Sequence, residues 1–289
     1  TRADKEADRI RHVDVCSAQT GPIFLAYRRR EAIEQEVQAA MAKEPVYDFT
    51  APDQVTHRLW VIDDKERVER IRQEFLKVEA IYIADGHHRC ASAVRVSRKR
   101  RAEHPDYTGA EEFNYFLSVL FPDEQLMIMD YNRVVNSLNG YGVDEFLEKV
   151  GEVFYVEEVG AEACKPQKKG EIGMYLHDRW YRLRVDEASY TGDPVEDLDV
   201  AVLQRKLLEP ILGIVDPKVD DRIDFVGGIR GLQELERRVH TDAKVAFAMY
   251  PTDIHELFAV SDAGKLMPPK STWFEPKLRS GILIHRIEQ

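Results

Sequence analysis

The sequence predicts an α+β protein made of two regions. Of its 289 residues, 44% are hydrophobic, a fraction that supports a packed core and excludes an intrinsically disordered chain. Compact apolar runs alternate with stretches whose apolar residues recur every three or four positions, which predicts strands mixed with helices. The character of these segments changes near residue 135. We therefore expect an N-terminal region of residues 1–135 and a C-terminal α/β region of residues 136–289.

In the N-terminal region, the strongest strand signals are the apolar runs 23–27 and 80–84. Asp63 or Asp64 is a candidate N-cap for a helix whose apolar residues step by three and four. A charged, helix-like start is expected at residues 5–14, and a helix that ends near Pro45 is expected at residues 31–43. Further strands are expected at residues 46–50, 57–62, 114–121 and 126–130.

The C-terminal region continues this mixture. Residues 172–176 and 180–185 are expected to form the two arms of a hairpin, because the second run alternates apolar and polar residues. Residues 198–212 carry a strong helical pattern. The other helices and strands are expected at residues 142–150, 154–159, 224–226, 232–239, 245–250 and 254–259.

The sharpest chemical feature is Asp85-Gly86-His87-His88-Arg89, which directly follows the apolar run 80–84. A strand, a tight turn and a helix place these polar side chains at a helix N-terminus, where free N–H groups and a partial positive charge favour an anion. Arg89 adds a planar fork suited to phosphate or carboxylate, and the histidines can donate hydrogen bonds or move protons near neutral pH. A structural alternative is a helix capped by Asp85. The added His-His-Arg favours a functional site.

The overall charge argues against a nucleic-acid partner. Lys and Arg number 41 and Asp and Glu 52, which gives a net charge of −11, whereas a duplex-binding protein needs a basic face. Residues 95–101 form the one dense basic run, which is typical of a solvated helix face. This run also motivates the rival hypothesis of a regulatory or nucleic-acid-binding module.

Three widely separated cysteines, Cys16, Cys90 and Cys164, form no disulfide framework and no paired metal-ligand set, so we expect a cytoplasmic protein. No apolar run approaches the roughly 20 residues that span a bilayer. The chain begins without Met in charged, helix-like sequence, and we expect residues upstream that are absent from it.

Four stretches of the sequence carry a family resemblance. The motif of residues 83–89 resembles the signature of a large bacterial family known as a conserved domain of unknown function. Residues 5–10 and 21–24 resemble the stretch that precedes this motif in the family, and residues 224–228 resemble a later strand and turn. Residues 267–277, in which Met-Pro-Pro-Lys-Ser-Thr is followed by Phe274 and Lys277, resemble its C-terminal signature. The resemblance extends over nearly the whole chain.

Members of this family include pyrophosphate-dependent serine kinases, and the motif also resembles that of nucleotide-dependent free serine kinases on the ParB/sulfiredoxin-like fold. The resemblance implies a ParB/sulfiredoxin-like catalytic region followed by the C-terminal α/β region. Asp85 would be the catalytic base or the Mg²⁺ ligand, and His87 a second catalytic group. His88 and Arg89 would bind the donor's phosphates. Cys90 departs from the aromatic residue often found there.

Other segments could add to this site. Lys270, Ser271 and Thr272 could supply further phosphate-binding groups, although the neighbouring prolines could equally fix an extended tail with solvated lysines. Lys5 and Arg9 fall in a stretch similar to the family and are candidates for substrate binding. A zinc site at His87, His88 and Cys90 is a weaker alternative, because adjacent histidines seldom face one tetrahedral ion.

These observations predict a small-molecule kinase, a phosphotransferase that acts on free L-serine with pyrophosphate or a nucleotide and Mg²⁺ and forms O-phosphoserine. The partners expected are therefore small molecules, with neither nucleic acid nor membrane; a homodimer stays open. A different phosphotransferase or hydrolase with the same anion site is a further alternative.

Overall fold

The computed structural model describes residues 3–275 and 277–288, and of residues 3–5 it describes the backbone alone. The chain folds into two compact units. Unit 1 consists of residues 1–126 together with 277–289, and unit 2 consists of residues 127–276. The composition change near residue 135 therefore lies inside unit 2, not at the division between the units.

Unit 1 is built on a three-stranded sheet with the order β5-β2-β6. The central strand β2 (Ile23–Tyr27) is buried along its whole length, which explains its unbroken apolar run. It pairs antiparallel with β5 (Ile81–Asp85) and parallel with β6 (Ser118–Pro122). The runs 23–27 and 80–84 are thus confirmed as strands.

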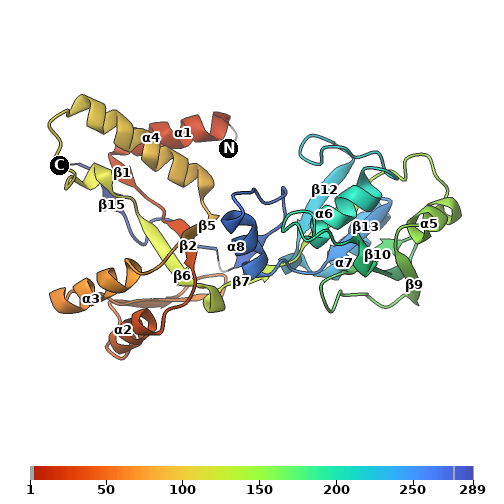
Figure 1. Ribbon diagram of the computed structural model, residues 1–289, viewed down its shortest axis with the longest axis horizontal. Coiled ribbons are helices and arrows are strands. Elements are labelled where there is room, and N and C mark those ends of the chain that lie inside the picture. Colours follow the sequence, from red (N-terminus) through yellow and green to blue (C-terminus); the bar gives the residue numbers. More distant parts are fainter. Residues whose placement is uncertain (1–2, 276, 289) are drawn as a thin grey trace. The chain divides into compact units, whose positions relative to one another are not determined.

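The described residues of unit 1 form the α-helices α1 (Ala3–Cys16), α2 (Glu31–Met41), α3 (Lys65–Phe75) and α4 (His87–Glu103). Helix α1 lies along α4 (Figure 1). Between them, Val13 of α1, Val96 of α4 and Phe113 form a small core with Ile287 from the end of the chain. The N-cap of α3 is Asp64, whose carboxylate accepts the Arg67 N–H at 2.8 Å.

Two strand pairs complete unit 1. Strands β3 (Tyr47–Thr50) and β4 (Thr56–Leu59) form an exposed antiparallel hairpin. Strand β1 (Ala18–Gln19) pairs antiparallel with β15 (His285–Arg286), so the last residues of the chain return to unit 1. Two short 3₁₀ turns, η1 (Glu112–Asn114) and η2 (Asp123–Gln125), flank β6.

Unit 2 contains a six-stranded sheet in which every neighbouring pair is antiparallel. Its strands, in sheet order, are β12 (Ile223–Gly227), β8 (Tyr131–Val135), β13 (Val245–Met249), β10 (Glu171–Leu176), β11 (Arg179–Arg184) and β9 (Tyr155–Gly160). The predicted hairpin of residues 172–185 is confirmed as β10–β11. A separate pair joins β7 (Met127–Met129) to β14 (Trp273–Glu275).

The central strands β10 and β13 of the unit 2 sheet are buried on both faces, whereas the edge strand β9 is largely exposed. Along β13, Val245, Phe247 and Met249 enter the larger core, and Ala246 and Ala248 face a second core, as the alternation of a strand requires. The larger core includes residues of α5 (Val143–Gly151) and α6 (Asp199–Leu203); the second includes α7 (Leu232–Thr241). The remaining elements are the 3₁₀ turns η3 (Glu187–Ser189) and η5 (Gly228–Arg230), and α8 (Ile254–Asp262).

Three expectations need correction. The C-terminal region is α+β, because its sheet is antiparallel throughout and contains no parallel βαβ unit. The helix expected at 198–212 changes after Leu203 into a π-helical turn, η4 (Gln204–Leu208), and Pro210 has no N–H with which to continue a regular helix. The strand expected from residue 114 begins at Ser118, because residues 112–114 form η1.

The α+β class is confirmed for the chain as a whole. The ParB/sulfiredoxin-like description of the N-terminal region stays a prediction. Over the part of the chain that the structure describes, no helix combines the length and the apolar character needed to cross a bilayer.

Candidate functional site

The polar motif lies where β5 turns into α4. Strand β5 ends at Asp85, and α4 begins at His87, so Gly86 alone forms the turn. Gly86 has φ = +89°, a left-handed conformation that glycine adopts without a steric penalty. As a result, Asp85, His87, His88 and Arg89 surround the N-terminal end of a 17-residue helix. There the first backbone N–H groups have no partner within the helix.

These residues line a cavity of about 810 Å³ in unit 1. Its walls come from α1, from the segment around β1 and β2, from the start of α4 and from the returning C-terminal segment. The lining residues are Asp8, Arg9, His12, Val13, Gln19, Thr20, Gly21, Ile23, Asp85, Gly86, His87, His88, Arg89, Ser92 and Ser280. The volume lies in the range typical of small-molecule sites.

Arg89 lies across two glycines inside this cavity. A Cβ atom placed on Gly21 would lie 3.3 Å from Nη1 of Arg89 and 2.9 Å from Oγ of Ser280. No hydrogen bond or ion pair joins the guanidinium to another residue that the structure describes. The backbone below is more firmly held, since buried Ser92 donates its hydroxyl hydrogen to the Arg89 carbonyl at 2.9 Å. The N–H groups of the Arg89 guanidinium are thus available to bind an anion in the cavity.

The two histidines differ in their surroundings. His87 is an exposed residue, yet desolvation is the main cause that lowers its pKa from the ordinary value, while the nearby Asp85 carboxylate opposes this shift. His87 therefore tends to be neutral near pH 7 and able to accept a proton. His88 is partly buried, and its Nδ1 atom is fully buried without a hydrogen-bond partner among the described residues.

The C-terminal segment reaches the motif through Lys277. Its Nζ lies 3.6 Å from Oδ2 of Asp85, while Oδ1 of Asp85 accepts the Gly86 N–H at 2.7 Å. Further along, the Gly281 N–H donates to the Thr20 carbonyl at 2.8 Å, which places Ser280 in the cavity wall. Sequence reasoning missed Ser280, and no local pattern marks it.

Helix α1 brings a second group of polar residues. Arg9, predicted as a substrate-binding residue, lines the cavity together with Asp8 and His12. Asp8 and His12 are four residues apart, the spacing that places two side chains on one helix face, so helical periodicity could have revealed His12. The side chain of Lys5, the other predicted substrate ligand, lies outside the described part of the structure.

The predicted phosphate ligands Lys270, Ser271 and Thr272 belong to unit 2. Ser271 is buried and donates its hydroxyl hydrogen to the Pro268 carbonyl, while its own carbonyl accepts from the Thr252 hydroxyl at 3.1 Å. The Nζ of Lys270 lies over the Tyr131 ring, 5.5 Å from its centroid. All these contacts are internal to unit 2 and hold a turn in place.

The donor set of the cavity suits Mg²⁺ better than zinc. Among the residues that the structure describes, no group of three or more His, Cys, Asp or Glu side chains is arranged to hold a metal ion. Magnesium differs from structural zinc because one or two carboxylates suffice for it, the remaining ligands being waters and substrate phosphates. Asp85 and Asp8, which line the same cavity, supply such carboxylates.

Part of the basic run at the end of α4 is paired with an acidic residue. Lys99 lies 2.5 Å and Arg100 3.1 Å from the carboxylate of Asp14 in α1. Arg101 donates to the Asn114 side chain at 2.7 Å. These three contacts fasten α4 to α1 and to η1.

Comparison with solved structures finds distant similarities over almost the whole chain. A structure described as a free serine kinase in complex with AMP is 14% identical, with a TM-score of 0.41, and the match covers 97% of this chain and 85% of that one. A truncated SbnI from Staphylococcus aureus is 12% identical, with a TM-score of 0.47 and coverage of 97% and 79%.

A conserved hypothetical protein from Pyrococcus furiosus is 15% identical, with a TM-score of 0.39 and coverage of 96% and 87%. No curated protein sequence matches the chain significantly. Residues 1–201, which include the whole Asp85–Arg89 motif, match the family described as "Protein of unknown function (DUF1015)", and the chain belongs to that family.

Proposed function

We propose that this protein is a small-molecule phosphotransferase that transfers a phosphoryl group from pyrophosphate or a nucleotide to the hydroxyl of free L-serine. The observation that carries the proposal is Arg89, a positioned guanidinium without a protein partner among the described residues, in the same cavity as the carboxylate of Asp85. The resemblance of residues 83–89 to the motif of serine kinases supplies the choice of reaction and acceptor.

Phosphoryl transfer depends mainly on holding a highly charged donor and placing the acceptor in line with it. In the proposed complex, Arg89, His88 and the first N–H groups of α4 bind the donor's phosphates. Nδ1 of His88 would gain the partner that it lacks among the described residues. Arg9 and His12, on the wall formed by α1, are placed to contact serine or the end of the donor.

The reaction requires one proton to leave the serine hydroxyl. The serine hydroxyl oxygen forms a bond to the terminal phosphorus of the donor. The bond between that phosphorus and the rest of the donor, which leaves as phosphate or as the shortened nucleotide, breaks at the same time. Asp85 accepts the hydroxyl proton, and neutral His87 is a second acceptor in the same turn. If Asp85 instead holds Mg²⁺ together with Asp8, the ion would neutralise part of the donor's charge and His87 would accept the proton.

The test is to incubate the protein with L-serine, Mg²⁺ and one donor at a time, and to detect O-phosphoserine by phosphorus NMR and mass spectrometry. We expect product with pyrophosphate or a nucleotide. Asp85→Asn should lower kcat by about 100-fold or more, and Arg89→Met should mainly raise the KM for the donor.

Matched controls are Asp106→Asn and Arg98→Met, which make the same changes at exposed positions outside the cavity wall. Both should leave the rate unchanged. Absence of phosphoserine with every donor would refute the serine kinase. A different phosphorylated or hydrolysed product that is lost in Asp85→Asn would assign the cavity to another phosphate reaction.

A further inference from the structure

Unit 2 contains a cavity of its own, of about 440 Å³. This volume is within the range of small-molecule sites. The apolar part of its wall includes Val200, Leu208, Ile223, Phe225, Pro268 and Pro269. Charged side chains line it as well: Arg133, Arg205, Lys218, Glu196, Glu209 and Asp216. All its lining residues belong to unit 2, so the cavity is distinct from the one in unit 1.

One cation is buried in the wall of this cavity. Arg133 of β8 is only 3% exposed, and its guanidinium lies over the Phe225 ring, 5.6 Å from the centroid. It donates to the backbone carbonyls of Tyr131 and, at 3.1 Å, of Lys270. A guanidinium carries five N–H groups, so the other three have no acceptor among the described residues.

Arg133 forms no ion pair with a carboxylate of a described residue, although Glu196, Glu209 and Asp216 line the same cavity. Burial lowers the pKa of Arg133 to about 10, so the side chain still carries its charge at neutral pH. Its two partners are neutral carbonyl groups. An unbalanced buried charge is costly, and the cost falls when an anion enters the cavity and pairs with it. Guanidinium binds a carboxylate through two parallel hydrogen bonds.

A second polar side chain that lines this cavity, Gln204, has a buried hydrogen-bond acceptor without a donor among the described residues. Gln204 lies at the start of the π-helical turn η4, a widened turn often found at functional sites. Its amide donates to the Ile214 carbonyl at 2.7 Å, which fixes the side chain. Oε1 of Gln204 is buried and has no hydrogen-bond partner within the described residues. This acceptor requires an N–H or O–H group.

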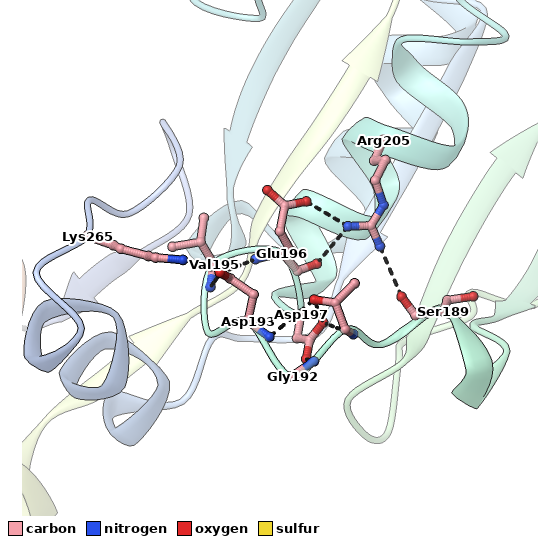
Figure 2. A network of polar contacts seen from close by, with 9 residues as sticks. Ser189, Gly192, Asp193, Val195, Glu196, Asp197, Arg205 and Lys265 are labelled. Carbon is pink, nitrogen blue, oxygen red and sulfur yellow. Dashed lines mark hydrogen bonds and ion pairs between the residues drawn. The ribbon is translucent and has the colours of Figure 1, made fainter.

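The rim of the cavity is held by its own ion pair. Figure 2 shows Arg205 with Glu196, at 2.7 Å, and with the Ser189 carbonyl, at 3.1 Å. The loop that carries Glu196 is fixed by Asp193, which accepts the Val195 N–H at 2.9 Å and pairs with Lys265 (Figure 2). The charge of Arg205 is therefore satisfied within the rim, whereas that of Arg133 is not.

We infer that unit 2 binds a small organic acid with an apolar body and an N–H or O–H donor beside its carboxylate, that is, an apolar amino acid or hydroxy acid. The carboxylate pairs with Arg133, the donor reaches Oε1 of Gln204, and the apolar body fills the space between Val200 and Phe225. The inference uses no residue of the unit 1 cavity and does not depend on the reaction proposed for it.

Calorimetric titration of the full chain tests this inference with four probes of one shape. L-Leucine and 2-hydroxy-4-methylpentanoate carry both polar groups, 4-methylpentanoate lacks the donor, and 3-methylbutylamine lacks the carboxylate. We expect at least one of the first two to bind, 4-methylpentanoate to bind about tenfold more weakly, and the amine not to bind. No binding of either complete probe, or equal binding of the amine, overturns the inference.

Two variants locate the site. Ala201→Leu places a larger side chain at a lining position, where it should fill part of the cavity and abolish binding. Ala263→Leu makes the same change at an exposed position outside the cavity and should leave binding unchanged. Arg133→Lys keeps the charge but loses the planar fork, and should weaken binding about tenfold. Thermal unfolding checks that each variant is folded.

Unchanged binding in folded Ala201→Leu would also overturn the inference. The double variant Arg9→Met/Arg89→Met, which removes both arginines from the wall of the unit 1 cavity, should bind the same probe as the original chain does. A loss of binding in this double variant, shown to be folded, would assign the ligand to unit 1 and contradict the proposed site.

Discussion

Gly86 and Arg89 are packed so closely that a single methyl group would disturb them: a Cβ on Gly86 would lie 3.1 Å from Nε of Arg89. The same glycine has a positive φ that other residues adopt only with strain. Gly86 therefore has two roles, one in the backbone turn and one in leaving room for the guanidinium.

The two roles can be separated by comparing Gly86→Ala with Gly109→Ala. Gly109 has a similar φ of +96°, but nothing lies within 4 Å of its added Cβ. Both variants should lose stability by about 1 kcal/mol from backbone strain. Only Gly86→Ala should also weaken pyrophosphate binding, by about tenfold, in a calorimetric titration. Equal donor affinities in the two variants would show that Arg89 does not depend on the space at Gly86.

Donor binding should be linked to proton uptake at His87. In the free protein, desolvation lowers the pKa of His87 below its ordinary value of 6.5. A bound polyanion favours the charged imidazole and raises this pKa, so protons are taken up at pH values between the two. Titration with pyrophosphate in buffers of different ionisation enthalpy measures the uptake. The proton uptake should be largely absent in His87→Gln, and an unchanged uptake would assign the proton to another group.

The buried carboxyl of Asp199 should make the stability of unit 2 depend on pH. Both its oxygens accept the Gly170 N–H, at 3.0 and 3.1 Å, and burial raises its pKa from 3.8 to about 7. Between pH 3.8 and about pH 7, Asp199 keeps its proton in the folded state and loses it in the unfolded state. The contribution of this carboxyl group to the free energy of unfolding therefore falls as the pH rises and is lost by about pH 7.

Asp199→Asn mimics the protonated form. Its unfolding free energy relative to the original chain should rise from pH 4 to pH 7 and then stay constant, by an amount on the order of a few kcal/mol. Denaturant unfolding at several pH values measures this difference. Asp221→Asn, an exposed change of the same charge, should give a small and flat difference. A flat profile for Asp199→Asn would contradict the assigned pKa.

Nucleic-acid binding should be absent. Lys99 and Arg100 are paired with Asp14, and the chain carries a net charge of −11 that repels a polyanion. Fluorescence anisotropy with labelled duplex and single-stranded DNA and RNA at low salt should detect no complex. Affinity that falls steeply with added salt would revive the regulatory alternative.

The parts of the fold that the sequence predicted well are those determined by local patterns. The apolar run of β2, the N-cap of α3 at Asp64 and the hairpin β10–β11 each follow from neighbouring residues. The π-helical turn after Leu203 did not, because residues 198–212 keep a helical apolar pattern through it. The antiparallel order of the unit 2 sheet also depends on contacts between distant segments.

The candidate site shows the same division. Asp85, His87, His88 and Arg89 could be found together because they are consecutive at a helix start. Ser280 could not, since its segment reaches the cavity through long-range contacts, such as the bond from the Gly281 N–H to the Thr20 carbonyl and the pairing of β1 with β15. Gly21 falls in a stretch recognised from family resemblance, but its contact with Arg89 is visible only in three dimensions.

The return of the last residues to unit 1 has a consequence for synthesis on the ribosome. Residues 127–276 are translated between the two parts of unit 1, so unit 2 can fold while β1 still waits for its partner β15. Ile287, a member of the core between α1 and α4, emerges after all of these residues. The cavity around Arg89 is therefore completed only after unit 2 has been made, and a nascent chain that stops early lacks the wall containing Ser280.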